Sequence, residues 1–72
     1  QQLAFWRELD GQRVLAAFNA AEEITLALEL DGCTEGFLED LLHPGAHFTV
    51  QGGRAQLPLP ARGARILLWQ PR

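Results

Sequence analysis

The stretch Glu23-Ile24-Thr25-Leu26-Ala27-Leu28-Glu29-Leu30-Asp31 decides the fold class of this chain. Large aliphatic side chains recur at every second position, with Thr, Ala and Glu between them. A period of two is typical of a β-strand with one buried face. Leu and Ala favour helices, but burial of one face normally outweighs intrinsic propensity. The stretch therefore predicts a strand over residues 24–30.

Turn signals divide the rest of the 72-residue chain into similarly short segments. Asp10-Gly11 has the composition of a two-residue hairpin turn in which both residues take a positive φ. Further turns are expected at Asp31-Gly32, Gly52-Gly53 and Gly63. Strands are predicted at residues 3–9, 13–19, 24–30, 37–42, 46–51, 54–59 and 64–69, with one helical turn as the alternative at 37–42. About seven short, closely spaced strands predict an all-β fold, a small antiparallel β-sandwich. Pro58 and Pro60 lack an N–H, so the sixth strand should lie at an edge or end there.

Composition narrows the class of protein further. Hydrophobic residues make up 47% of the chain, which is typical of a globular domain. The net charge of −3 argues against a nucleic-acid partner, and no apolar run is long enough to cross a membrane. Cys33 is the one cysteine, so no internal disulfide is possible, which slightly favours the cytoplasm and leaves localisation open.

The size and the start of the chain suggest a dependent domain. A single domain is expected over residues 1–72, and the opening Gln1 without Met suggests a segment cut from a longer protein. A domain near this size buries only about 60% of its unfolded surface, so it should gain stability from a neighbour.

Alternation also predicts which side chains face the core. Residues expected to point inward are Val14, Ala16, Phe18, Phe48, Val50, Leu57 and Leu59, with Leu3, Phe5, Leu9, Ile66 and Leu68 on the matching faces of the first and last strands. Both tryptophans then point outward. Trp6, Leu67 and Trp69 are predicted to form an apolar patch, and such patches usually mark a contact. Burial of both tryptophans in the core is the alternative.

No constellation of catalytic or metal-binding residues stands out. Glycosidases need two carboxylates about 5–9 Å apart, but the adjacent pairs Glu22/Glu23 and Glu39/Asp40 would point to opposite strand faces. The carboxylates, Asp40 included, are expected to be solvated surface charge. No catalytic residue is predicted.

The remaining reactive residues have structural explanations. His43 and His47 are separated by Pro44-Gly45, which prevents a shared helix face, so a loop His and an exposed strand His are expected and no metal site. Cys33 is expected to be a free thiol without a role, because no base is placed beside it. Asn19 should be a turn residue at a strand end. No cofactor is predicted.

Three segments in chain order resemble the C-terminal β-domain of the α-amylase family of glycoside hydrolases, in its cyclomaltodextrinase, neopullulanase and α-glucosidase branches. Residues 3–19, LAFWRELDGQRVLAAFN, fit an apolar–Phe–x–Arg strand, a short turn and a strand that ends in Asn. DLLHPG at residues 40–45 is similar to the family's Asp-Leu-Leu-(Ser/Thr)-Gly segment. Residues 53–68, GRAQLPLPARGARILL, are similar to its closing G-x-L-x-L-P-P-x-x-x-x-V-L-L pattern. His43-Pro44 and Ala61-Arg62 depart from the pattern, and both lie in expected loops.

The resemblance implies a non-catalytic accessory domain of an α-glucan-active enzyme. In that family, catalysis belongs to an upstream (β/α)8 barrel with a carboxylate nucleophile and a carboxylic acid, on which the C-terminal β-sandwich packs. The expected partner is that barrel, and the parent protein is expected to be a glycosidase. Two alternatives stay open: a carbohydrate-binding module that holds an α-glucan on Trp6 and Trp69, or an interaction sandwich unrelated to sugars.

Overall fold

The computed structural model describes residues 1–71, and these residues form seven β-strands and no helix. The strands are β1 (Gln2–Leu9), β2 (Gln12–Asn19), β3 (Ile24–Glu29), β4 (Gly36–Asp40), β5 (His47–Val50), β6 (Arg54–Leu59) and β7 (Ala64–Pro71). All lie close to the predicted ranges, so the all-β prediction is confirmed. The difference at residues 37–42 is that β4 ends at Asp40, which leaves Leu41 and Leu42 in the following turn, without a helical turn.

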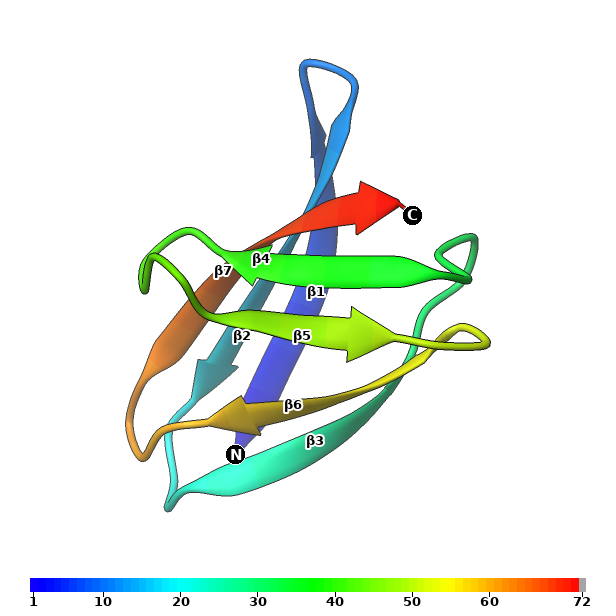
Figure 1. Cartoon of the computed structure of the whole chain (residues 1–72). Helices are drawn as coiled ribbons and strands as arrows, with labels where there is room; N and C mark the ends of the chain where they lie inside the picture. The colour runs from blue at the N-terminus through cyan, green and yellow to red at the C-terminus, as the bar shows by residue number, and fades with distance from the viewer. Residues whose placement is uncertain (72) are drawn as a thin grey trace.

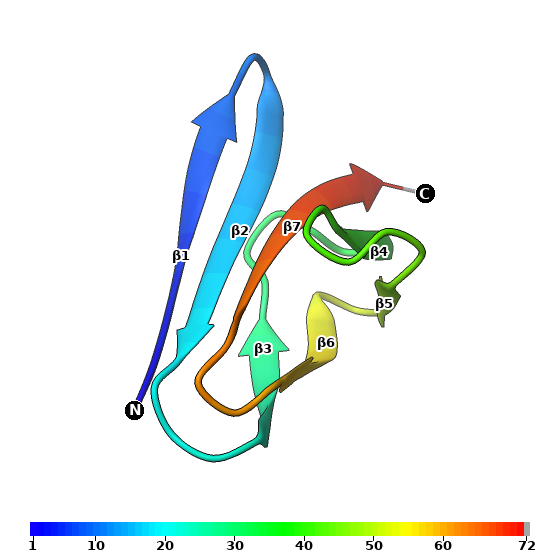
Figure 2. The ribbon, with the colours of Figure 1, turned by 90° about the vertical axis from the view of Figure 1, so that its left-hand side faces the viewer.

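The strands form two antiparallel sheets that pack as a sandwich (Figure 1). The larger sheet has the order β1-β2-β7-β4-β5, and the smaller one consists of β3 and β6. The chain changes sheet between β2 and β3, β3 and β4, β5 and β6, and β6 and β7, a Greek-key-like path. Because the smaller sheet has only two strands, it covers the inner face of the larger sheet only in part. Figure 2 shows the β1–β2 hairpin extending past the rest of the sandwich.

The hairpin turn between β1 and β2 is the one that its sequence predicts. Asp10 and Gly11 have φ values of 52° and 78°, so both central residues take the left-handed conformation that a type I′ turn requires. The ladder that follows runs without interruption from Leu9↔Gln12 to Gln2↔Asn19. A two-residue turn thus fixes the register of the whole hairpin.

The core lies between the two sheets. Its buried side chains are Leu15, Ala17, Leu30, Cys33, Leu38, Val50, Ala55, Leu57, Leu59 and Leu67. The predicted inward positions of Val50, Leu57 and Leu59 are confirmed, and Phe48 packs against the same cluster. β3 is the one strand of residues 1–71 with which β6 forms a ladder, which confirms the predicted edge position of β6. The Pro58 carbonyl accepts a hydrogen bond from Arg65 Nε.

The predicted faces of β1, β2 and β7 are wrong. Leu15 and Ala17 point into the core, whereas Phe18, expected inside, is 41% exposed. Both faces of β2 and β7 carry apolar residues, so alternation alone cannot identify the inner one. Leu15 pairs with Trp6 of β1 and with Leu67 of β7, so these three side chains lie on the same face of the sheet. A wrong assignment of the inner face in one of these strands therefore makes the assignment wrong in all three.

Candidate interaction surface

The three residues predicted to form an outward patch lie on the inner side of the larger sheet. Leu67 is fully buried in the core, so the prediction that it faces a partner is wrong. Trp6 and Trp69 are partly buried and pack against the core cluster, as in the alternative interpretation of the tryptophans. A contact between either tryptophan and a partner stays a prediction.

An apolar patch does exist, on the opposite face of the same sheet. We define the outer-face patch as Leu3, Phe5, Val14, Ala16, Phe18, Ile66 and Leu68. The ladder register places these side chains in adjacent rows across β1, β2 and β7: Leu3↔Phe18↔Ala64, Phe5↔Ala16↔Ile66 and Arg7↔Val14↔Leu68. Leu3 is 60% and Phe5 37% exposed. The sequence placed Leu3 and Phe5 on one face correctly but assigned that face to the core.

Aromatic contacts organise the patch. The rings of Phe5 and Phe18 stack with centroids 6.1 Å apart, and the Arg7 guanidinium lies 5.4 Å from the Phe5 centroid. The Leu41 amide donates to the Ile66 carbonyl, which places the exposed Leu41 beside the patch. Contiguous apolar surface of this kind on a small domain usually marks a contact site.

A buried ion pair lies at the opposite, inner side of the sheet. Arg65 Nη1 is 2.6 Å from Asp40 Oδ2, and the Asp40 side chain is completely buried. The same guanidinium lies 4.9 Å from the centroid of the Phe48 ring. Since Arg65 also bonds the Pro58 carbonyl, it connects β7 and β4 of the larger sheet to β6 of the smaller one. The expectation that Asp40 is a solvated surface charge is therefore wrong.

The Asp40 carboxylate is fully hydrogen-bonded. Besides Arg65, it accepts hydrogen bonds from the amides of Leu42 and His43, and its Oδ2 lies 3.0 Å from His43 Nδ1. Burial alone would raise the pKa of Asp40. The hydrogen bond from Arg65 and the other three together outweigh burial and lower that pKa below its usual value. The pair links β4 and β7 within the larger sheet, and the bond from Arg65 to the Pro58 carbonyl extends this link to the smaller sheet.

Asn19 is the predicted turn residue and has a larger role than predicted. Its Oδ1 accepts from the Ala21 amide, the local turn bond expected of Asn, and also from Gln2 Nε2. Its Nδ2 donates to the carbonyls of Glu22 and Pro60. The Pro60 contact joins segments far apart in the chain, which no local sequence signal could reveal.

Cys33 is a buried free thiol, as predicted. Arg13 Nη1 lies 3.2 Å from its Sγ, and the Arg13 guanidinium lies 4.7 Å from the centroid of the Trp6 ring. Burial raises the pKa of the thiol, and the positive charge of Arg13 offsets this only in part. A buried thiol with a raised pKa is a poor nucleophile.

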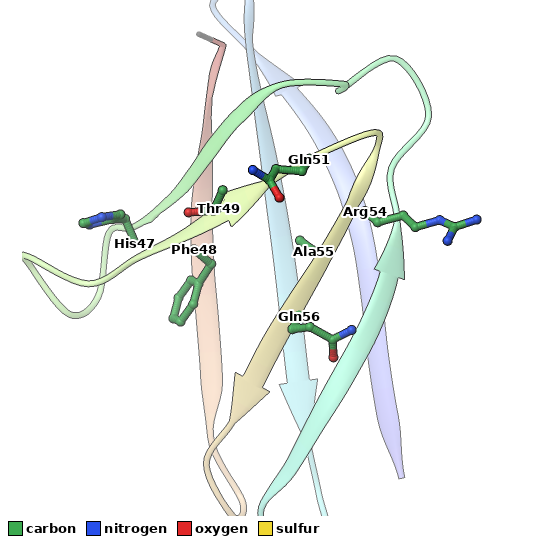
Figure 3. A pocket seen from close by; sticks show the side chains of 7 residues that line it. All are labelled: His47, Phe48, Thr49, Gln51, Arg54, Ala55 and Gln56. Carbon is green, nitrogen blue, oxygen red and sulfur yellow. The ribbon is translucent and has the colours of Figure 1, made fainter.

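The concave surfaces are shallow and polar. One groove, of about 490 Å³, lies where β5 and β6 separate, beyond the bridge between Gln51 and Arg54 (Figure 3). Figure 3 shows the Arg54 side chain pointing away from the side chains of β5.

His47 is exposed on β5 and His43 lies in a loop, as expected from the sequence. Within residues 1–71 no cluster of three or more His, Cys, Asp or Glu side chains could hold a metal. The same residues contain no helix that is long and apolar enough to span a membrane.

Comparison with known proteins supplies one structural relative. No protein-family model matches the sequence, and no curated protein matches it. The structure is similar to part of AmyP, solved as a variant in complex with maltotriose, with a TM-score of 0.80 and 23% sequence identity. The match covers 97% of this chain and 14% of the AmyP chain. This chain therefore has the fold of a small part of a much longer protein.

Proposed function

We propose that this chain is the non-catalytic C-terminal accessory domain of an α-glucan-active glycoside hydrolase of the α-amylase family, and that it packs on the catalytic barrel and stabilises it. The coverage of the AmyP match carries the proposal, since nearly all of this chain corresponds to 14% of that protein. AmyP was solved with maltotriose, an α-glucan. The three sequence segments that resemble the family's C-terminal domain point the same way.

The proposed contact with the barrel is the outer-face patch. Domain interfaces within a chain bury about 600–1,500 Å², and the outer face of β1, β2 and β7 offers a broad apolar surface for such a contact. In isolation, Leu3, Phe5 and Phe18 remain in water at a cost of up to about 1.5–3 kcal/mol each relative to full burial. The position of the Trp6 and Trp69 rings, against the domain's own core, supports this surface over a sugar platform built on the tryptophans.

Substitutions in the parent enzyme test this assignment. Phe5→Glu combined with Phe18→Glu should lower the melting temperature of the enzyme and its half-life at elevated temperature, while kcat at low temperature stays near normal. Glu29→Gln on β3 is the control, because this exposed residue lies on the other sheet and should leave stability unchanged. Unchanged thermal inactivation in the double variant would reject the outer-face patch as the barrel contact. Full stability after deletion of the whole segment would reject the stabilising role itself.

A further inference from the structure

We propose that the chain forms a symmetric dimer in which the free edge of β1 pairs antiparallel with β1 of a second copy. β1 is eight residues long, lies at the end of the larger sheet and has β2 as its one ladder neighbour. Figure 2 shows it as the outermost strand. Edge strands are usually protected by shortness, by Pro, by charged side chains, especially Lys, or by a bulge. β1 has neither Pro nor Lys, its two charged residues, Arg7 and Glu8, lie near one end of the strand, and its unbroken register with β2 leaves no bulge.

The backbone of β1 presents a regular set of unused hydrogen-bonding groups. The Ala20 amide donates to the Gln1 carbonyl at 2.8 Å, which makes residues 1 and 20 a hydrogen-bonded pair. Bonded pairs alternate in an antiparallel ladder, so the odd-numbered residues of β1 bond to β2. The N–H and C=O groups of Gln2, Ala4, Trp6 and Glu8 therefore point to the free edge. A second antiparallel strand along this edge would form hydrogen bonds with all of these groups.

Symmetry and side-chain chemistry select one register. A two-fold axis perpendicular to the sheet keeps the outer faces of both copies on the same side, so outer residues must oppose outer residues. With the axis at Trp6, Leu3 lies opposite Leu9 of the second copy and Phe5 opposite Arg7. The guanidinium of Arg7 already lies against a Phe5 ring within one chain. An axis at Phe5 would pair the two Phe5 rings, but it would place both Leu3 side chains against Arg7 and leave Leu9 opposite Gln1, without an apolar partner. An axis at Arg7 would place two guanidinium groups directly opposite each other, which is destabilising.

A second copy of β1 is the partner strand that best matches the free edge of β1. Leu9 is 57% exposed at the end of the hairpin, and in this register it gains Leu3 of the second copy as an apolar partner without two like charges being placed opposite each other. Edge pairing also leaves the outer-face patch open, so the dimer goes beyond the proposed barrel contact and does not depend on it. Pairing of one strand per copy belongs to the class of small interfaces, below about 1,200 Å², which are weak and transient.

Sedimentation velocity of the chain from about 10 µM to about 1 mM tests the dimer, because weak complexes dissociate over this range. The wild type should shift from monomer to dimer as the concentration rises. Ala4→Pro removes an N–H that faces the free edge and spares the bonds to β2, so it should lower the dimerisation constant at least tenfold. Ala4→Val keeps that N–H and is the matched control.

A second measurement needs no variant. Leu3 and Leu9 are separated by about 20 Å along one strand, so a nuclear Overhauser contact between their methyl groups must arise between two copies. The contact should appear at high concentration and disappear on dilution. A wild type that stays monomeric at the highest concentration would overturn the proposal. So would an equally stable dimer in Ala4→Pro, or a dimer without the Leu3–Leu9 contact.

Discussion

Replacing Arg65 with Met should show what the buried ion pair contributes to the fold. The variant keeps most of the aliphatic stem but leaves the buried Asp40 carboxylate without its cation. Loss of one partner of a buried pair costs about 3–5 kcal/mol. The three hydrogen bonds that remain on Asp40 place the expected loss at the low end, about 3 kcal/mol. For an m-value of about 1 kcal/mol/M, the urea midpoint should fall by about 3 M.

The matched control is Arg62→Met. Arg62 lies 3.8 Å from Glu22, but both side chains are more than two-thirds exposed, at 71% and 86%. Exposed pairs contribute between about 0 and 1 kcal/mol, so this variant should unfold nearly like the wild type. Equal urea midpoints for the Arg65 and Arg62 variants would contradict the structural role assigned to the buried pair.

The pH dependence of stability gives an independent readout of the same pair. Because the pKa of Asp40 is lowered in the folded chain, the carboxylate stabilises the fold above the pKa of the unfolded chain, near 3.8. That contribution is lost as pH falls through the folded pKa. In Arg65→Met the largest cause of lowering is gone and burial acts in the opposite direction, so the acid-induced loss should be smaller. An unchanged stability difference between pH 7 and pH 3 would show that Arg65 does not set the ionisation of Asp40.

Three further substitutions test the packing. Leu67→Ala should lower the free energy of unfolding, measured by chemical denaturation, by about 2–5 kcal/mol. Leu68→Ala, on the outer face, should lower it clearly less. A larger loss for Leu68→Ala would mean that the even-numbered residues of β7 face the core, as the sequence predicted. Asn19→Ala leaves the part-buried carbonyl groups of Glu22 and Pro60 without their donor and should cost about 1–3 kcal/mol, measured as a lower melting temperature. Unchanged melting would mean that water replaces the side chain. Gly36→Ala should leave little folded chain by circular dichroism, because a Cβ there would lie 2.2 Å from the Gln70 carbonyl oxygen and φ is 151°.

Sequence reasoning succeeded where the signal is local. The positive φ values at Asp10 and Gly11 follow from residue types that tolerate them, and the alternation at residues 24–30 identifies β3. It failed where the outcome depends on pairing between distant segments. Asp40 looks like any acidic residue at a strand end, and only the β4–β7 ladder, with Asp40 opposite Leu67, brings it beside Arg65. Likewise, Asn19 predicts a turn, but its bond to Pro60 depends on the complete fold.

The failure to assign the faces of β2 and β7 is itself informative about function. A strand with one solvated face alternates apolar and polar residues, whereas a strand covered on both faces is apolar throughout. VLAAF at residues 14–18 and ILL at 66–68 have the second pattern. In the folded chain the smaller sheet covers only one side of these strands, and Phe18 on the other side is 41% exposed. These strands thus have the sequence of a sheet that is buried on both faces, whereas this chain buries only one of the two faces. This mismatch supports the proposal that a neighbouring domain covers the second face. The Phe5→Glu/Phe18→Glu variant of the proposed parent enzyme removes the apolar surface on which that domain would pack.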